Sequence, residues 1–290
     1  VLITALLMFS TAFPGDATGS ERECVISFGA PLDCMVFHMG EFYHEHYDPY
    51  KEVIAALPCD FDISFFKDCE EVHDALDSGR IDVAGSRIEC YLKARKKLGV
   101  KPVLQVKVNS KYTHRGVLLV RKDSALEGIE DLRGGVLSTV ESDSLIYNHY
   151  MKYLVRRETG DGLRVFFDRV LMCPSVAAAI YSVVLGQADA VMADEEFLNI
   201  ERIGNELRPI EYSFDIPYAL MYTMPGLDDT AEEFSKKARD GLQAVPEQER
   251  VGKLFDVVTT LDYVQDPDFE EFMKTLNEHG LQGRVFGEDD

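Results

Sequence analysis

The stretch from Leu118 to Asp194 constrains the fold most, because strand-like and helix-like segments alternate along it. It opens with LLVRKDSALEGIEDLRGGVLSTV, which predicts a strand, a short helix and a second strand. ESDSLIYNHYMKYLVRR predicts a helix with a polar start, and PSVAAAIYSVVLGQADAVMAD predicts a helix, a Gly-Gln break and a strand. Two predicted helices, with N-termini at Ser142 and Ser175, therefore follow strand ends.

The N-termini of these two helices favour a binding site over a catalytic one. The first turn of a helix has free backbone N–H groups and a partial positive charge, which suit an anionic or strongly polar ligand. The sequence contains no GxSxG, P-loop or HExxH motif that would supply a catalytic set. We therefore expect the chain to bind a ligand without transforming it.

Composition is that of a soluble globular protein and narrows the range of partners. The chain has 290 residues, with 46% hydrophobic and 28% charged residues, and its length favours two domains. Its formal net charge of −21, from 30 basic and 51 acidic residues, repels nucleic acid and anionic membrane surfaces. We therefore exclude both as partners.

The first residues, VLITALLMFSTAF, form an apolar run that is short for a membrane span. The run resembles the apolar core of a secretory signal, and Ala17-Thr18-Gly19 supplies small residues for a cleavage site. A buried N-terminal strand is the alternative. We expect residues 1–19 to be a signal-peptide-like segment and the mature chain to be soluble and exported from about Ser20.

Six cysteines in a chain that is expected to be exported permit disulfides, with 15 possible full pairings. Cys24 and Cys59 begin two strands that we expect to be neighbours. The alternatives are a disulfide bridge between them or two buried free thiols. The spacing of His38, His44 and His46 does not match a zinc motif. We therefore predict no metal site and no cofactor.

The first part of the chain predicts a βαβαβ order. VISFGA and FDISFF predict strands, and EEVHDALDSGRIDVAGS predicts a helix, a break at Gly79 and a third strand. SRIECYLKARKKLGV starts the next helix and brings Arg87 and Tyr91 near the end of that strand. This order implies a parallel sheet with the ligand at the carboxyl ends of the strands.

We expect the chain to cross between two lobes twice, near residues 109–116 and 205–216, without a flexible linker. Lobe 1 would comprise residues 20–110 together with 212–290, and lobe 2 residues 111–211. Two such crossings predict a hinge. The tail predicts three helices, of which PEQERVGKLFDVV is the second.

The segments DALDSGRIDVAGS, RGVLLVRKDSALEGIEDLRGG and AAAIYSVVLGQADAVMAD, in this order, resemble the phosphate/phosphite/phosphonate-binding proteins of ABC importers. The resemblance covers residues 24 to 200 and, more weakly, the helical tail. It implies the type II periplasmic binding fold, with two α/β lobes, each a mainly parallel sheet flanked by helices, and two hinge crossings.

The resemblance also indicates site residues. Tyr91 matches the aromatic residue of the first lobe, and Asp194 matches an acidic position after the Gly-Gln-x-Asp strand. Where the family has a Ser-Thr-Ser run, this chain has Glu141 followed by Ser142, Asp143 and Ser144. Positive charge near these carboxylates would come from residues of both lobes. The expected ligand-binding residues are Arg87, Tyr91, Arg115, Ser142, Asp143, Ser144, Ser175 and Asp194.

The implied function is that of a monomeric, periplasmic solute-binding protein without a cofactor. It would close on a small anionic or zwitterionic, phosphonate-like ligand and pass it to an ABC permease in the membrane. A sensory or scaffold protein on the same fold is one alternative. The other is a transferase, for which Asp143 with His114 is the best available acid–base pair.

Overall fold

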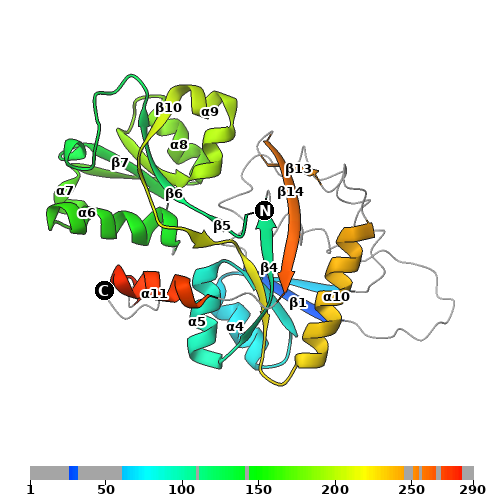
Figure 1. Cartoon of the computed structure of the whole chain (residues 1–290). Coiled ribbons are helices and arrows are strands. Elements are labelled where there is room, and N and C mark those ends of the chain that lie inside the picture. The colour runs from blue at the N-terminus through cyan, green and yellow to red at the C-terminus, as the bar shows by residue number, and fades with distance from the viewer. Residues whose placement is uncertain are drawn as a thin grey trace. The chain divides into compact units, whose positions relative to one another are not determined.

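The computed structural model of the chain describes residues 26–31, 61–108, 111–140, 144–244, 251–254, 257–265 and 269–282. These residues form two compact units, each of which contains sheets and helices (Figure 1). Unit 1 holds the described residues within Val1–Tyr112, Tyr218–Leu254 and Val258–Pro267. Unit 2 holds those within Thr113–Pro217, Phe255–Val257 and Asp268–Asp290.

The sheet of unit 1 has the strand order β13-β14-β4-β12-β3-β1-β2 in the described residues. Its strands are β1 (Ile26–Pro31), β2 (Phe61–Phe66), β3 (Val83–Ser86), β4 (Lys101–Val108), β12 (Leu220–Thr223), β13 (Val251–Leu254) and β14 (Val257–Gln265). The predicted parallel part is present, because β1 pairs in parallel with both β2 and β3. Antiparallel pairs follow, because β12 runs opposite to β3 and β4, and β14 runs opposite to β4. The sheet is therefore mixed.

The helices of unit 1 are α4 (Cys69–Asp77), α5 (Ile88–Leu98) and α10 (Asp228–Ala244). Helix α4 buries one face of Val72, Ala75 and Leu76, as its apolar spacing predicts. It is followed by Gly79 with φ 68, a left-handed conformation that glycine adopts without steric cost. On α10, Phe234 stacks on Phe28 of β1 with ring centroids 6.1 Å apart.

The Asp68 side chain caps α4 by accepting hydrogen bonds from the backbone N–H groups of Glu70 and Glu71, each at 3.1 Å. We expect Asp68→Ala to lower the free energy of unfolding by about 1 kcal/mol. The Glu71 N–H lowers the pKa of Asp68, so this contribution is complete above the ordinary carboxyl range and disappears as pH falls through the lowered pKa.

Denaturant unfolding of both proteins as a function of pH measures this difference. Asp77→Ala is the matched control, because Asp77 ends α4 and its charge opposes the helix dipole there. That change should stabilise the chain slightly. A cap whose loss costs the same at all pH values would contradict the assignment.

The main sheet of unit 2 has the order β10-β6-β9-β7-β8 in the described residues. Its strands are β6 (Gly116–Arg121), β7 (Val136–Val140), β8 (Arg169–Cys173), β9 (Ala190–Asp194) and β10 (Leu207–Tyr212). β7 pairs in parallel with β8 and β9, whereas β6 is antiparallel to β9 and β10. A two-stranded ladder of β5 (Thr113–His114) and β11 (Ile216–Pro217) lies where the chain enters and leaves the unit.

Helices cover this sheet, with α6 and α7 on one side and α8 and α9 on the other (Figure 1). The helices are η3 (Glu130–Leu132), η4 (Leu145–Tyr150), α6 (Met151–Thr159), α7 (Leu163–Phe166), α8 (Val176–Val184), η5 (Glu195–Asn199) and α9 (Glu201–Glu206). The strands beneath are nearly continuous apolar runs: every residue from Val117 to Val120 is fully buried. Strands covered on both faces have this composition.

The C-terminal helix α11 (Glu270–Glu278) lies in unit 2, whereas the sequence analysis places residues 212–290 in lobe 1. Aromatic packing accounts for the difference. Phe214 meets Phe272 with ring centroids 6.2 Å apart, and it meets His279 at 4.9 Å. His279 also contacts Tyr153 edge-on at 5.3 Å. These contacts attach α11 to unit 2.

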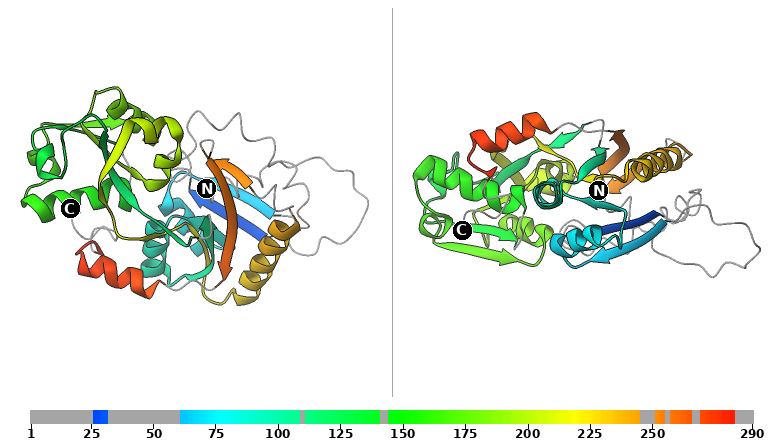
Figure 2. Two further views of the ribbon diagram at one scale, coloured as in Figure 1. Left: turned by 45° about the horizontal axis from the view of Figure 1, so that its top comes forward. Right: turned by 90° about the horizontal axis from the view of Figure 1, so that it is seen from below.

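The predicted helix PEQERVGKLFDVV is wrong in its described part, because residues 251–254 and 257–265 are strands. The segment VVTTLDYVQ is rich in β-branched residues, which favour strands. β14, the long orange strand in Figure 2, pairs antiparallel with β4 over Leu261–Gln265. Pairing with a distant strand thus overrides the local helical spacing.

Candidate ligand-binding site

The candidate site of unit 2 lies at the carboxyl edge of its parallel strands. Ser144 follows β7, Ser175 follows β8, and Asp194 is the last residue of β9. Because β7 pairs in parallel with both neighbours, these three ends meet at one edge of the sheet. Ligands in open α/β sheets bind at this edge. The structure thus brings together three residues that the sequence analysis selected separately.

The first helix at this edge begins at Leu145, with Ser144 at its N-cap, and not at Ser142 as the sequence analysis predicts. The Ser144 hydroxyl accepts from the backbone N–H of Tyr147 at 3.4 Å, and its carbonyl accepts from Asn148 and His149. The helix η4 is a π-helix, a rare form that occurs frequently at functional sites. Ser142 and Asp143 lie outside the described residues.

Ser175 caps the second helix as predicted. Its hydroxyl accepts from the backbone N–H of Ala178 at 3.1 Å, and α8 continues for nine residues from Val176 to Val184. The side chain is half-buried. A helix of this length presents a partial positive charge at its N-terminus, which is the end beside Ser175.

Asp194 is buried and is held by neighbouring residues of unit 2. Its Oδ1 accepts from the backbone N–H of Glu196 at 3.1 Å and so caps η5. Its Oδ2 is hydrogen-bonded to Nδ1 of His114 on β5. Asp194 therefore holds both β5 and η5 at this edge of the sheet.

Arg115 is paired within the unit. Its guanidinium donates to Oε2 of Glu195 at 2.8 and 3.2 Å and lies 4.5 Å from the centre of the Tyr212 ring. The hydrogen bond with Glu195 raises the pKa of Arg115. The sequence analysis proposes Arg115 as a source of positive charge but misses Glu195, whose position next to Asp194 was the only available signal.

The two candidates of unit 1 follow β3. Arg87 stands at the N-cap of α5 and is half-buried. Tyr91 is only 1% exposed, and its ring packs against Tyr222 of β12 at 5.5 Å between centroids. Burial raises the pKa of the Tyr91 hydroxyl. Tyr91 is therefore part of the core of unit 1, and Tyr222 is the neighbour that the sequence analysis misses.

Two features are absent from the described residues. Within these residues, no helix combines the length and apolar character needed to cross a membrane. The same residues contain no group of three or more His, Cys, Asp or Glu side chains arranged to hold a metal ion. His38, His44 and His46 lie outside this part of the chain.

Solved structures of similar architecture identify the class of fold. A protein from Xanthomonas citri bound to ATP has 16% identity and a TM-score of 0.64, covering 92% of this chain and 99% of its own. PhnD1 from Prochlorococcus marinus in complex with methylphosphonate has 12% identity and a TM-score of 0.63, covering 89% and 98%. A binding-protein component of an ABC phosphonate transporter from Pseudomonas aeruginosa has 15% identity and a TM-score of 0.59, covering 91% and 89%. The predicted type II periplasmic binding fold is confirmed.

A sequence-family comparison identifies the family within this class. The profile described as ABC transporter, phosphonate, periplasmic substrate-binding protein matches residues 43–269. The chain therefore belongs to the periplasmic phosphonate-binding proteins of ABC transporters, and the resemblance noted from its motifs is confirmed. No curated protein sequence matches the chain significantly.

Proposed function

We propose that this chain binds a small phosphonate-like ligand, anionic or zwitterionic, and delivers it unchanged to an ABC permease. The family match over residues 43–269 carries this proposal. The protein would act as a soluble monomer in the periplasm, without a cofactor and without catalysis. Residues 1–19 would be removed on export, which the intact mass of the chain recovered from the periplasm tests.

The proposed ligand position in unit 2 is the carboxyl edge of β7, β8 and β9. The anionic head would lie at the N-termini of η4 and α8, beside Ser144 and Ser175, where backbone dipoles favour negative charge. Ser142 and Asp143 belong to the same proposed set. An amine on the ligand would lie toward the carboxylate of Asp194, whose negative charge attracts a cation.

The remaining proposed contacts carry positive charge or an aromatic ring. Arg87 and Tyr91 are the proposed residues of unit 1, and Arg115 is proposed at the edge of unit 2. Because Arg115 already donates to Glu195, a ligand would share its guanidinium. Because Tyr91 is buried, it presents little surface to a ligand. Arg115 and Tyr91 would therefore contribute less to ligand binding than the helix N-termini at Ser144 and Ser175.

We expect 2-aminoethylphosphonate, a zwitterion, to bind at least about tenfold more tightly than inorganic phosphate. The reason is that the helix N-termini favour the anionic head, and Asp194 favours the amine, so a zwitterion satisfies both. Titration calorimetry with 2-aminoethylphosphonate, methylphosphonate and phosphate measures the order.

Recovery of the ligand tests the absence of catalysis. Phosphorus NMR of each probe after prolonged incubation with the protein should show the compound unchanged. Turnover of any probe would refute the transport proposal, and tighter binding of phosphate than of both phosphonates would refute the ligand class.

A further inference from the structure

The disulfide between Cys69 and Cys90 joins the first turn of α4 to the first turn of α5 in unit 1. The two residues are 21 apart in sequence, with Cα atoms 5.7 Å apart. Their surroundings differ: Cys69 is half-buried, whereas Cys90 is only 2% exposed. The Cys24–Cys59 alternative from the sequence analysis lies outside the described residues. The unequal access to the two sulfurs already points to an asymmetric chemistry.

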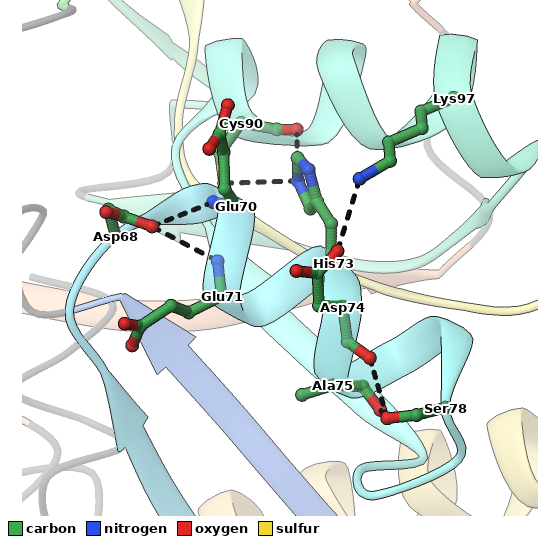
Figure 3. A network of polar contacts seen from close by, with 9 residues as sticks. All are labelled: Asp68, Glu70, Glu71, His73, Asp74, Ala75, Ser78, Cys90 and Lys97. Carbon is green, nitrogen blue, oxygen red and sulfur yellow. Dashed lines mark hydrogen bonds and ion pairs between the residues drawn. The ribbon is translucent and has the colours of Figure 1, made fainter.

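A hydrogen-bond donor is directed at Cys90 from α4. Nε2 of His73 lies 3.1 Å from the carbonyl oxygen of Cys90 and 3.6 Å from its Sγ (Figure 3). A carbonyl oxygen only accepts, so Nε2 must carry the proton. Burial lowers the pKa of His73, which keeps the ring neutral near pH 7. The same N–H, which donates to the carbonyl oxygen, therefore also lies within reach of the sulfur of Cys90.

A second donor reaches the same sulfur from β12. The Tyr222 hydroxyl lies 3.6 Å from Sγ of Cys90 and 3.2 Å from the Ser86 hydroxyl, which itself donates to the carbonyl oxygen of Arg87 at 3.0 Å. The Tyr222 proton therefore has two acceptors within reach, Oγ of Ser86 and Sγ of Cys90. A disulfide sulfur is a weak acceptor, whereas a thiolate is charged, and hydrogen bonds to charged groups are stronger. Both donors thus favour negative charge on Cys90.

The surroundings of Cys69 disfavour negative charge. The Asp68 carboxylate occupies the backbone N–H groups of Glu70 and Glu71, which would otherwise stabilise a thiolate at the start of α4 (Figure 3). Three carboxylates therefore flank Cys69 in the chain, at positions 68, 70 and 71. Cys90 also follows an acidic residue, Glu89, so the two direct donors are what distinguishes it.

We propose that Cys69–Cys90 is a directional thiol–disulfide exchange site, at which an external thiolate bonds to Cys69 and Cys90 is the leaving thiolate. The S–S bond breaks, its electron pair goes to Sγ of Cys90, and the attacking sulfur is joined to Cys69. The second thiol of a dithiol reductant then attacks the reductant sulfur that is bonded to Cys69, and Cys69 is released as a thiol. The dithiol becomes a disulfide. The protein disulfide gains two electrons and two protons and becomes two cysteine thiols.

The same path run backwards defines how the bond forms. A disulfide-donating oxidant would bond to Cys69, and the stabilised Cys90 thiolate would attack that mixed disulfide and expel the oxidant as a thiol. The partner class is therefore a dithiol–disulfide exchange protein, or a small dithiol of the same chemistry. Either one engages α4 at Cys69 and does not need to reach the buried Cys90.

Trapping with a monothiol tests the direction on the native full-length chain. After brief exposure to 2-mercaptoethanol, acid quenching and alkylation, peptide mass spectrometry locates the mixed disulfide. We expect it on Cys69 at least about tenfold more often than on Cys90, because access and leaving-group stability act together. Equal amounts, an excess on Cys90, or a bond that is reduced only after the chain unfolds would each overturn the proposal.

Tyr222→Phe tests the role of the donor, because it removes only the hydroxyl. We expect reduction by dithiothreitol to become slower by about tenfold, since a poorer leaving group leaves more slowly. Tyr112→Phe, at a 46% exposed tyrosine of the same unit, is the control and should not change the rate. A merely loosened fold would expose the bond and accelerate reduction, so an accelerated or unchanged rate in Tyr222→Phe would overturn the proposal.

Discussion

Replacement of Phe272 by alanine is expected to lower the stability of unit 2 by about 3–5 kcal/mol, the range for a buried phenylalanine. Phe272 is 7% exposed and packs on Phe214, and Leu276 on the same helix face is fully buried. Removal of the ring leaves a cavity between α11 and the segment that contains Phe214. Helix α11 should then detach from the rest of unit 2 more readily.

Hydrogen exchange of the α11 amides measures this opening without assuming that both units unfold together. Lys274→Ala is the matched control on the same helix, since its ammonium group forms an exposed ion pair with Glu278 at 3.7 Å. That pair contributes little, and we expect a change within about 0.5 kcal/mol. Exchange in α11 that is equally fast in both variants would show that Phe272 does not attach the helix.

The position of α11 could not be predicted from local pattern. The amphipathic spacing of DFEEFMKTLNEHG predicts a helix, and the structure has one at Glu270–Glu278. What local pattern does not encode is the partner. Phe214 and Tyr153 are 58 and 119 residues before Phe272 in the sequence, and only the folded chain brings these rings together. Unit membership is a long-range property.

At residues 257–265 the secondary structure itself was predicted wrongly. The preceding segment has helical spacing, and PEQERVGKLFDVV predicts a helix that ends at Val258. Antiparallel pairing with β4 decides the outcome, because the backbone of Leu261–Gln265 gains hydrogen-bond partners there. By contrast, helices with strong caps, such as α4 behind Asp68 and α8 behind Ser175, were predictable from a few neighbouring residues.

At the candidate site, residue types could be predicted but their pairing could not. Asp194, His114 and Arg115 each appear in the sequence analysis. Their combination depends on the antiparallel register of β6 and β9, which sets Gly116 opposite Asp194. That register places His114 and Arg115, which directly precede Gly116, within reach of Asp194 and Glu195. Asp194 and Arg115, both expected to face a ligand, therefore have internal partners.

Asp194→Asn is expected to weaken binding of 2-aminoethylphosphonate by about 1.5–3 kcal/mol, the range for a hydrogen bond to a charged group. Asparagine retains an acceptor oxygen for the Glu196 N–H, so η5 should stay capped. The lost charge removes the attraction for the ligand amine. Methylphosphonate has no amine, and its affinity should stay equal or rise slightly because a negative charge near the anionic head has gone.

Titration calorimetry of both phosphonates on both proteins separates ligand contact from positioning. Asp189→Asn is the matched control: Asp189 directly precedes the first residue of β9, so the same charge is removed at the opposite end of the strand from Asp194. It should leave the ratio of the two affinities unchanged. If Asp194→Asn weakens both phosphonates equally, Asp194 acts by holding His114 and η5 in place. If it changes neither affinity, the carboxylate is occupied by its internal contacts, and the amine of a zwitterion must be recognised elsewhere.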